Sequence, residues 1–112
     1  MKTHHLDDMV KGWFVGAFEP TALSTNACEV AVKRYKAGDH EEGHYHKVAT
    51  EITLVVNGII RMSNRNLFEG DIITILPGEI TDFHAITDAA TVVVKIPGVL
   101  DDKFTSTEFS LK

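Results

Sequence analysis

Two histidines and a glutamate near the middle of the chain have the types and the spacing that favour metal chemistry. His44 and His46 are separated by one residue, and Glu51 follows after a short gap. In an extended strand alternate side chains share a face, so both imidazoles project together while Tyr45 points to the other side. If the chain turns after His46 and continues as the next strand, Glu51 faces the two rings. Two imidazoles and one carboxylate with open coordination positions are the ligand set of non-haem iron sites.

The same histidine pair has a simpler interpretation. His-x-His also occurs on exposed strands, and histidines can line a pocket that holds no metal. The framing of the pair by Gly38, Glu51 and Gly58 at turn-like positions favours the metal site over these alternatives.

Length and composition narrow the class of protein. The chain has 112 residues, enough for one domain, and its net charge of −5 argues against nucleic acid and anionic membranes as partners. Cys28 is the only cysteine, so no intramolecular disulfide is expected. No apolar run approaches membrane-spanning length, and the N-terminus lacks the form of a signal peptide. A soluble cytoplasmic protein is therefore expected.

Short segments rich in β-branched residues recur between turn signals, which predicts an all-β barrel or sandwich. Asn57-Gly58 is a strong hairpin signal and predicts that the strand after it returns alongside the strand before it. The charged segment 39–42 is expected to be a loop that leads into His44, and residues 1–12 a loop or a short helical turn. Strands are expected at residues 28–36, 51–56, 59–63, 72–76, 80–86 and 91–96.

The middle of the chain, about residues 30–94, resembles the cupin superfamily. The first cupin motif has a glycine, His-x-His, a glutamate and a second glycine, and Gly38, His44, His46, Glu51 and Gly58 fill these places here. The resemblance implies a double-stranded β-helix, or jelly-roll, barrel in which the two histidines and the glutamate bind a divalent metal ion (Fe, Mn, Ni or Zn). One domain is then expected over residues 1–112, with an arm at 1–20, the barrel at 28–98 and a tail at 99–112.

The second cupin motif matches only in part. Gly70, Asp71, Pro77 and Gly78 fill its turns, but Thr81 occupies the usual place of the fourth ligand, a histidine. Phe83 matches the phenylalanine that often follows, and the nearest histidine is His84, which a regular strand would point away from Thr81 and Phe83. Three interpretations remain. The three ligands act alone, or a bulge brings in His84 as a fourth ligand, or the pocket binds a small molecule without metal.

The chemistry depends on the metal. A facial site on Fe(II) leaves positions for O₂ and a chelating substrate and supports a dioxygenase, whereas Mn, Ni or Zn as a Lewis acid supports an isomerase or lyase. Metal-free members of the superfamily include sugar epimerases with a histidine base and a tyrosine acid. That resemblance implies His44 or His46 as the base and Tyr35 as the acid. Tyr35, Thr81 and Phe83 are the candidate substrate-binding residues.

The alternative function class is a binding module for a sugar or a carboxylate without catalysis. An arginine or lysine that faces the barrel interior near the histidines would favour an anionic ligand, and the candidates are Lys33, Arg34, Lys36 and Arg61. A third class, a structural role with a vestigial site, predicts that loss of both histidines alters stability only slightly.

A homodimer is expected from the aromatic N-terminal arm and from the habit of the superfamily. Trp13, Phe14 and Phe18 cluster in that arm. Packing against the core or over the pocket as a lid is the preferred interpretation of these rings, and a dimer contact is the alternative.

Overall fold

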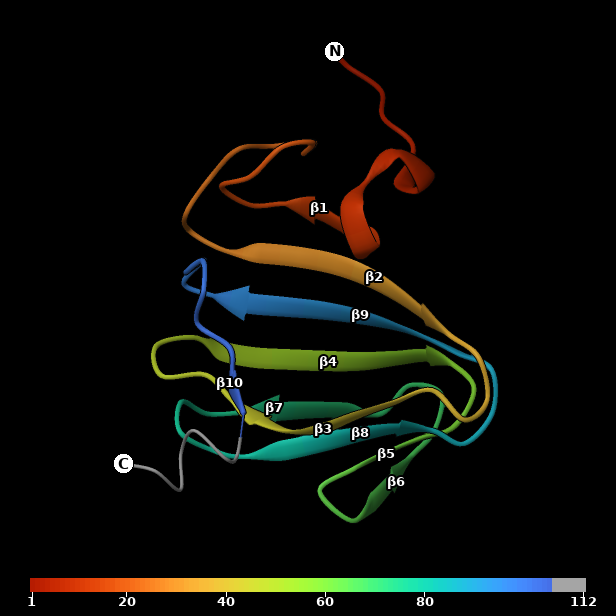
Figure 1. The fold of residues 1–112 in the computed structure, drawn as a ribbon. Helices are drawn as coiled ribbons and strands as arrows, with labels where there is room; N and C mark the ends of the chain where they lie inside the picture. The colour runs from red at the N-terminus through yellow and green to blue at the C-terminus, as the bar shows by residue number, and fades with distance from the viewer. Residues whose placement is uncertain (106–112) are drawn as a thin grey trace.

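The computed structural model describes residues 1–105, and within them ten strands form two five-stranded antiparallel sheets (Figure 1). The first sheet contains β1 (Trp13–Val15), β2 (Glu29–Tyr35), β4 (Thr50–Asn57), β7 (Ile72–Ile75) and β9 (Ala89–Ile96) in the order β1-β2-β9-β4-β7. The second contains β3 (His40–Tyr45), β5 (Ile60–Met62), β6 (Arg65–Leu67), β8 (Thr81–Ala85) and β10 (Phe104–Thr105) in the order β10-β3-β8-β5-β6.

The path of the chain between the sheets defines the fold. From β2 to β9 the chain passes back and forth between the two sheets, apart from the local β5–β6 hairpin. Strands that are neighbours in sequence therefore mostly lie in different sheets, facing each other across the interior. This alternation is that of a double-stranded β-helix and confirms the all-β jelly-roll fold predicted from the sequence.

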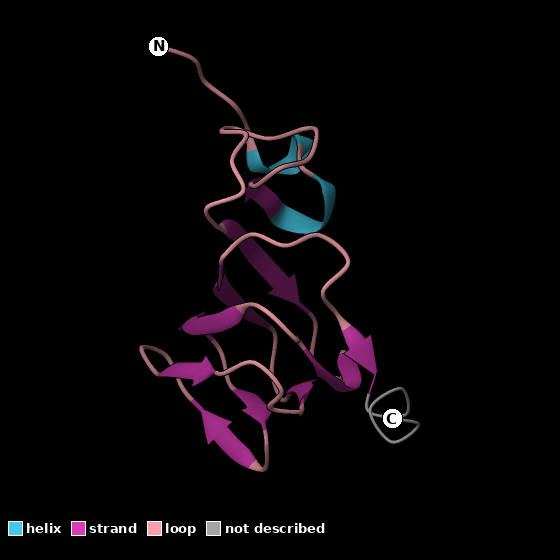
Figure 2. Ribbon diagram, turned by 90° about the vertical axis from the view of Figure 1, so that its left-hand side faces the viewer, coloured by secondary structure: helices cyan, strands magenta, loops and turns pink. Residues whose placement is uncertain are grey.

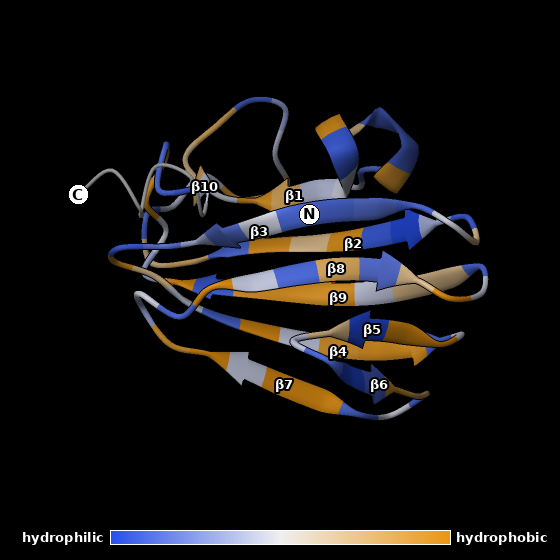
Figure 3. Cartoon of the chain, turned by 60° about the horizontal axis from the view of Figure 1, so that its bottom comes forward, coloured by the Kyte–Doolittle hydropathy of each residue, from blue (hydrophilic) through white to orange (hydrophobic). Residues whose placement is uncertain are grey.

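The core lies between the sheets and is built from alternate side chains of each strand. Val55 on β4 and Ile60 on β5 are fully buried, and Phe83 on β8 packs into the same cluster. Each such apolar side chain contributes roughly 1.5–3 kcal/mol on burial. Because the side-chain period of a strand is two, the register that buries Val55 also turns Glu51 inward. Figure 3 shows long apolar stretches on β4, β7 and β9, whereas β3 is polar along its length.

The predicted hairpin at Asn57-Gly58 is wrong. β4 pairs with β7 and β9, while β5 pairs with β6 and β8, so this turn carries the chain from one sheet to the other. Gly58 has φ 82°, and a Cβ there would lie 2.2 Å from the carbonyl oxygen of Asp88. The glycine is therefore required by the close approach of the turn before β9.

The predicted loop at residues 39–42 is also wrong. β3 begins at His40 and pairs with β8 on one side and β10 on the other. Charged residues form a strand here because pairing on both sides satisfies the backbone, whatever their intrinsic preference. Four residues of β3, from Glu41 to His44, lie opposite three on β8, from Phe83 to Thr81, so β3 contains a bulge.

The N-terminal arm extends the first sheet. Residues Leu6–Asp8 and Val10–Gly12 form two 3₁₀ turns (Figure 2), and β1 then pairs with the edge of β2. Trp13 lies opposite Ala31 in this pairing. No helix among residues 1–105 is long and apolar enough to cross a membrane.

Candidate metal centre

The structure brings His44, His46 and Glu51 together in the barrel interior. One ligand atom from each residue lies within 4.8 Å of the others, and all three residues are buried. The bulge in β3 turns both Glu41 and His44 inward, and His46 follows two residues later on the same side. Glu51 reaches the group from β4, and its Oε1 lies 3.3 Å from Nε2 of His46.

Backbone carbonyl groups orient both imidazole rings. Nδ1 of His46 lies 2.7 Å from the carbonyl oxygen of Asp102, and Nδ1 of His44 lies 3.2 Å from that of Glu42. A carbonyl oxygen can only accept a hydrogen bond, so each Nδ1 carries the hydrogen and donates it. Nε2 of each ring is therefore the atom left to bind a metal, which is the arrangement that second-shell groups impose in metal sites.

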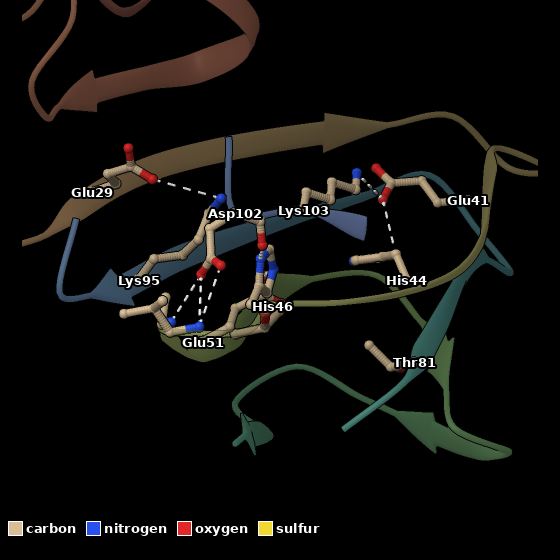
Figure 4. A network of polar contacts seen from close by, with 12 residues as sticks. Glu29, Glu41, His44, His46, Glu51, Thr81, Lys95, Asp102 and Lys103 are labelled. Atoms are coloured by element: carbon tan, nitrogen blue, oxygen red, sulfur yellow. Dashed lines mark hydrogen bonds and ion pairs between the residues drawn. The ribbon is translucent and has the colours of Figure 1, made fainter. Parts of the chain in front are cut away.

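Asp102 also fixes the turn between His46 and Glu51 (Figure 4). Its buried carboxylate accepts hydrogen bonds from the backbone N–H groups of Lys47 at 3.0 Å, Val48 at 3.1 Å and Ala49 at 2.9 Å. This role of Asp102 was not predicted, because the polar composition of residues 99–112 gives no sign of it. No local pattern marks Asp102, since its partners are more than fifty residues away in sequence.

The protonation of the group suits a metal site. Burial lowers the pKa of His44, which favours the neutral imidazole. Burial alone would raise the pKa of Glu51, but the adjacent Nε2 of His46 and the charges that His46, His44 and Lys95 carry when protonated outweigh it, and the pKa is lowered. Both residues are thus held in the forms that coordinate metal ions.

The structure does not bring His84 to this group. Thr81 is buried on β8 opposite His44, and Phe83 faces inward, whereas His84 points outward, stacks on His40 and lies 3.6 Å from Asp82. The extra residue of the bulge lies on β3, so β8 keeps its regular alternation and cannot re-aim His84. The Thr81 hydroxyl is bonded to Ser63 and to the carbonyl of Asp82, both at 2.9 Å.

The three candidate ligands open into a pocket of about 480 Å³ between the sheets. Of the predicted substrate-binding residues, Tyr35 and Phe83 line it, with ring centres 4.3 Å apart, whereas Thr81 does not. Burial and the nearby Glu41 carboxylate raise the pKa of Tyr35, so its hydroxyl stays protonated.

Two lysines of the first sheet face the pocket. Lys33 lines it from β2 and Lys95 from β9, while Arg34, Lys36 and Arg61 are exposed. Lys33 was one of the four sequence candidates, and Lys95 was not. The inward direction of Lys95 follows from its register, because it lies between Glu29 and Glu51 in the sheet.

No protein-family model and no curated protein sequence matches the chain. Among solved structures, it is similar to a protein with a double-stranded β-helix domain from Klebsiella pneumoniae subsp. pneumoniae MGH 78578 (TM-score 0.62, 23% identity, 66% of each chain covered). It is also similar to KdgF from Halomonas sp. (TM-score 0.60, 19% identity, 65% of this chain and 72% of that one).

A third similar structure is the dimethylsulfoniopropionate (DMSP) lyase DddQ from Ruegeria pomeroyi DSS-3, with TM-score 0.67 and 19% identity. The match covers 84% of this chain but 49% of that chain, so this chain spans about half of its length. At these identities the likeness concerns the fold. The chain has the cupin-type double-stranded β-helix fold, as the sequence motif implied, with a candidate metal centre in its interior.

Proposed function

We propose that the protein binds one divalent metal ion through His44, His46 and Glu51. The observation that carries the proposal is the convergence of three buried ligand atoms to within 4.8 Å, with Nδ1 of both histidines already bonded to carbonyl groups. Atoms that share a metal at about 2.1 Å lie roughly 3–4 Å apart, so only small side-chain adjustments are needed. Imidazole and carboxylate ligands suit Fe, Mn, Ni and Zn.

The chain's own residues then define what the centre can do. Because Thr81 adds no fourth imidazole, three protein ligands leave positions open for a chelating small molecule. The Tyr35 hydroxyl can donate a hydrogen bond to that molecule, and Phe83 and Met62 exclude water from the apolar end of the pocket. A metal bound here supplies Lewis acidity, or, if it is iron, a site for oxygen chemistry. Lewis acidity would support an isomerase or a lyase, and oxygen chemistry would support a dioxygenase.

Metal content is the experiment that tests the proposal. The untagged protein is incubated with Fe(II), Mn(II), Ni(II) or Zn(II), dialysed and analysed for each element. We expect about one metal ion per chain in the parent and almost none in a His44→Ala/His46→Ala variant. The matched control is His40→Ala/His84→Ala, which removes two histidines from the outer face and should keep the metal. A parent without metal, or a double variant that retains it, would refute the proposal.

A second function is supported by Thr81, which stands where a fourth ligand is usual. In this alternative the pocket binds a sugar or a carboxylate directly, without metal or catalysis. It predicts that the metal-free protein binds such a ligand and that added divalent metal leaves the affinity unchanged. A ligand that binds only after metal loading would exclude this alternative.

A further inference from the structure

A second cluster of functional groups lies in the same pocket, around Trp13. Nζ of Lys33 and Nζ of Lys95 each lie 4.8 Å from the centre of the Trp13 ring. The register explains this arrangement. Trp13 lies opposite Ala31 on β2. Ala31 is midway between Lys33 and Glu29, and Glu29 pairs with Lys95 on β9. The indole ring attracts both ammonium groups and holds them at the pocket wall.

The two lysines differ in how their charges are balanced. Nζ of Lys95 lies 3.6 Å from the buried carboxylate of Glu29. Lys33 donates a hydrogen bond to the carbonyl of Lys11 at 2.8 Å, but within residues 1–105 it has no carboxylate at ion-pair distance. The nearby Glu41 is paired with Lys103 at 3.2 Å. Lys33 is therefore a half-buried cation with unused donors, and burial lowers its pKa.

Two hydroxyl groups accompany Lys33. Thr91 lies directly opposite Lys33 on β9, lines the pocket and is fully buried. Its Oγ1 makes no hydrogen bond of normal geometry among the described residues, although its proximity to the Tyr35 hydroxyl acts to lower the pKa of Tyr35. Tyr35 follows Lys33 by two residues on the same face of β2 and stays protonated. A buried hydroxyl without a well-formed hydrogen bond in a polar pocket is a position for a ligand atom.

We propose that Lys33, Tyr35 and Thr91 form a subsite for the carboxylate group of a small organic acid. The ammonium group supplies charge, and the two hydroxyls supply hydrogen bonds, so one carboxylate meets three donors. A second oxygen-bearing group of the same acid reaches the His44, His46 and Glu51 centre. This second contact rests on the proposed metal site, whereas the carboxylate contact does not need metal.

Geometry limits the size of the acid. Lys33 pairs with Thr91, and Thr91 pairs with Val55, which is four residues along β4 from Glu51. Four residues of strand are about 13 Å between Cα atoms, and the side chains at both ends reach into the space between. The Lys33 side chain extends toward Trp13, in the direction of Glu51. The distance between its ammonium group and the His44, His46 and Glu51 centre, which a ligand must bridge, is therefore short. An acid of a few carbon atoms fits such a span.

The charge balance of the pocket explains why metal would strengthen this binding. Without metal, the pocket lining has five carboxylates and four lysines, which is an excess of one negative charge. A divalent ion would change the net charge of the lining from negative to positive, and a positive pocket attracts an anion. The lysines of the lining are Lys11, Lys33, Lys95 and Lys103, and its carboxylates are Glu29, Glu41, Glu51, Asp101 and Asp102.

Trp13 is the only tryptophan of the chain, so its fluorescence reports on this subsite. The probe is malonate, added to protein stripped of metal on a chelating resin so that no chelating anion remains in solution. We expect a saturable change in Trp13 emission with malonate and none with the uncharged malonamide. In Lys33→Gln the apparent affinity for malonate should fall at least tenfold. The matched control Lys36→Gln, exposed after the end of the same strand, should behave as the parent.

Metal uptake is measured on the same preparations, which separates the two proposals. The subsite is supported if Lys33→Gln loses malonate, either while it binds metal as the parent does or when the parent itself never binds metal. It is overturned if malonate gives no saturable change, or if Lys33→Gln responds as the parent does. If Lys33→Gln fails to fold by circular dichroism, Thr91→Val decides, with a several-fold weaker response expected and an unchanged response contradicting the subsite.

Discussion

His46 donates its Nδ1 hydrogen to the backbone carbonyl of Asp102, 56 residues later in the chain, over 2.7 Å. The carboxylate of the same aspartate binds the turn that leads from His46 toward Glu51. One residue of the C-terminal segment therefore sets the orientation of a candidate ligand and the path between two candidate ligands. Beyond it, Phe104 packs on Tyr45 with ring centres 5.5 Å apart. Phe109, the second phenylalanine of the tail, lies outside the described residues.

Replacement of Asp102 by alanine should weaken both folding and metal binding. The substitution leaves three backbone N–H groups of the turn without their acceptor, which costs about 2–4 kcal/mol of unfolding free energy. Loss of such a supporting group typically lowers metal affinity about 10–100-fold. Urea unfolding and metal titration measure the two effects. Asp101→Asn, which alters the exposed neighbour, should leave stability nearly unchanged, and equal effects of both substitutions would contradict this role of Asp102.

Thr81→His should add a fourth ligand. Thr81 is buried directly opposite His44, so an imidazole there faces the other ligands. We expect metal affinity to rise at least tenfold in competition with a chromophoric chelator. Thr81→Val removes the hydroxyl without adding a ligand and should give no gain. A folded Thr81→His protein with parental affinity would show that this position does not face the metal.

The buried hydroxyl of Tyr35 should make the stability of the protein fall as the pH rises above the ordinary pKa of tyrosine. Its folded-state pKa is raised above the ordinary value of 10.0 by burial and by Glu41. Its stabilising contribution is therefore fully present below pH 10.0 and is lost as pH rises through the folded-state pKa. The fall in unfolding free energy between about pH 9 and pH 11 should be steeper in the parent than in Tyr35→Phe. Parallel profiles would contradict the buried, protonated hydroxyl.

Homodimerisation stays a prediction, but it now rests on the outer face of the first sheet rather than on the aromatic N-terminal arm. Trp13 lines the pocket of its own chain, but the outer face of the first sheet is apolar. Ile52 pairs with Val94, and Leu54 pairs with Val92 and with Ile72, which is 63% exposed. An apolar stretch of this kind is complementary to the same stretch of a second copy.

Sedimentation of the parent and of Leu54→Glu tests this arrangement of the dimer. We expect the parent to sediment as a dimer and Leu54→Glu as a monomer, because the new carboxylate would be buried without a partner. His84→Glu places the same charge on the outer face of the second sheet and should remain dimeric. A monomeric parent would show that the prediction of a dimer is wrong.

The sequence sufficed for the fold class and for the convergence of His44, His46 and Glu51, because both follow from short-range patterns. His44 and His46 obey the two-residue period of a strand, and a single turn brings in Glu51. The pairing of β4 with β9 rather than with β5 depends on contacts distant in sequence. The local turn signal at Asn57-Gly58 therefore gave the wrong prediction of a hairpin. The roles of Asp102 and Lys95 likewise depend on tertiary register, which no local pattern encodes.

A crystal of the protein soaked with Mn(II) or Zn(II), measured at the absorption edge of the metal, tests the central claim most directly. The account predicts one anomalous peak in the barrel interior, about 2.0–2.2 Å from Nε2 of His44, Nε2 of His46 and a carboxylate oxygen of Glu51. The hydrogen bond from His46 to Asp102 should remain in that crystal. A peak only beside His40 and His84 on the outer face, or coordination through Nδ1 of either ligand histidine, would contradict it.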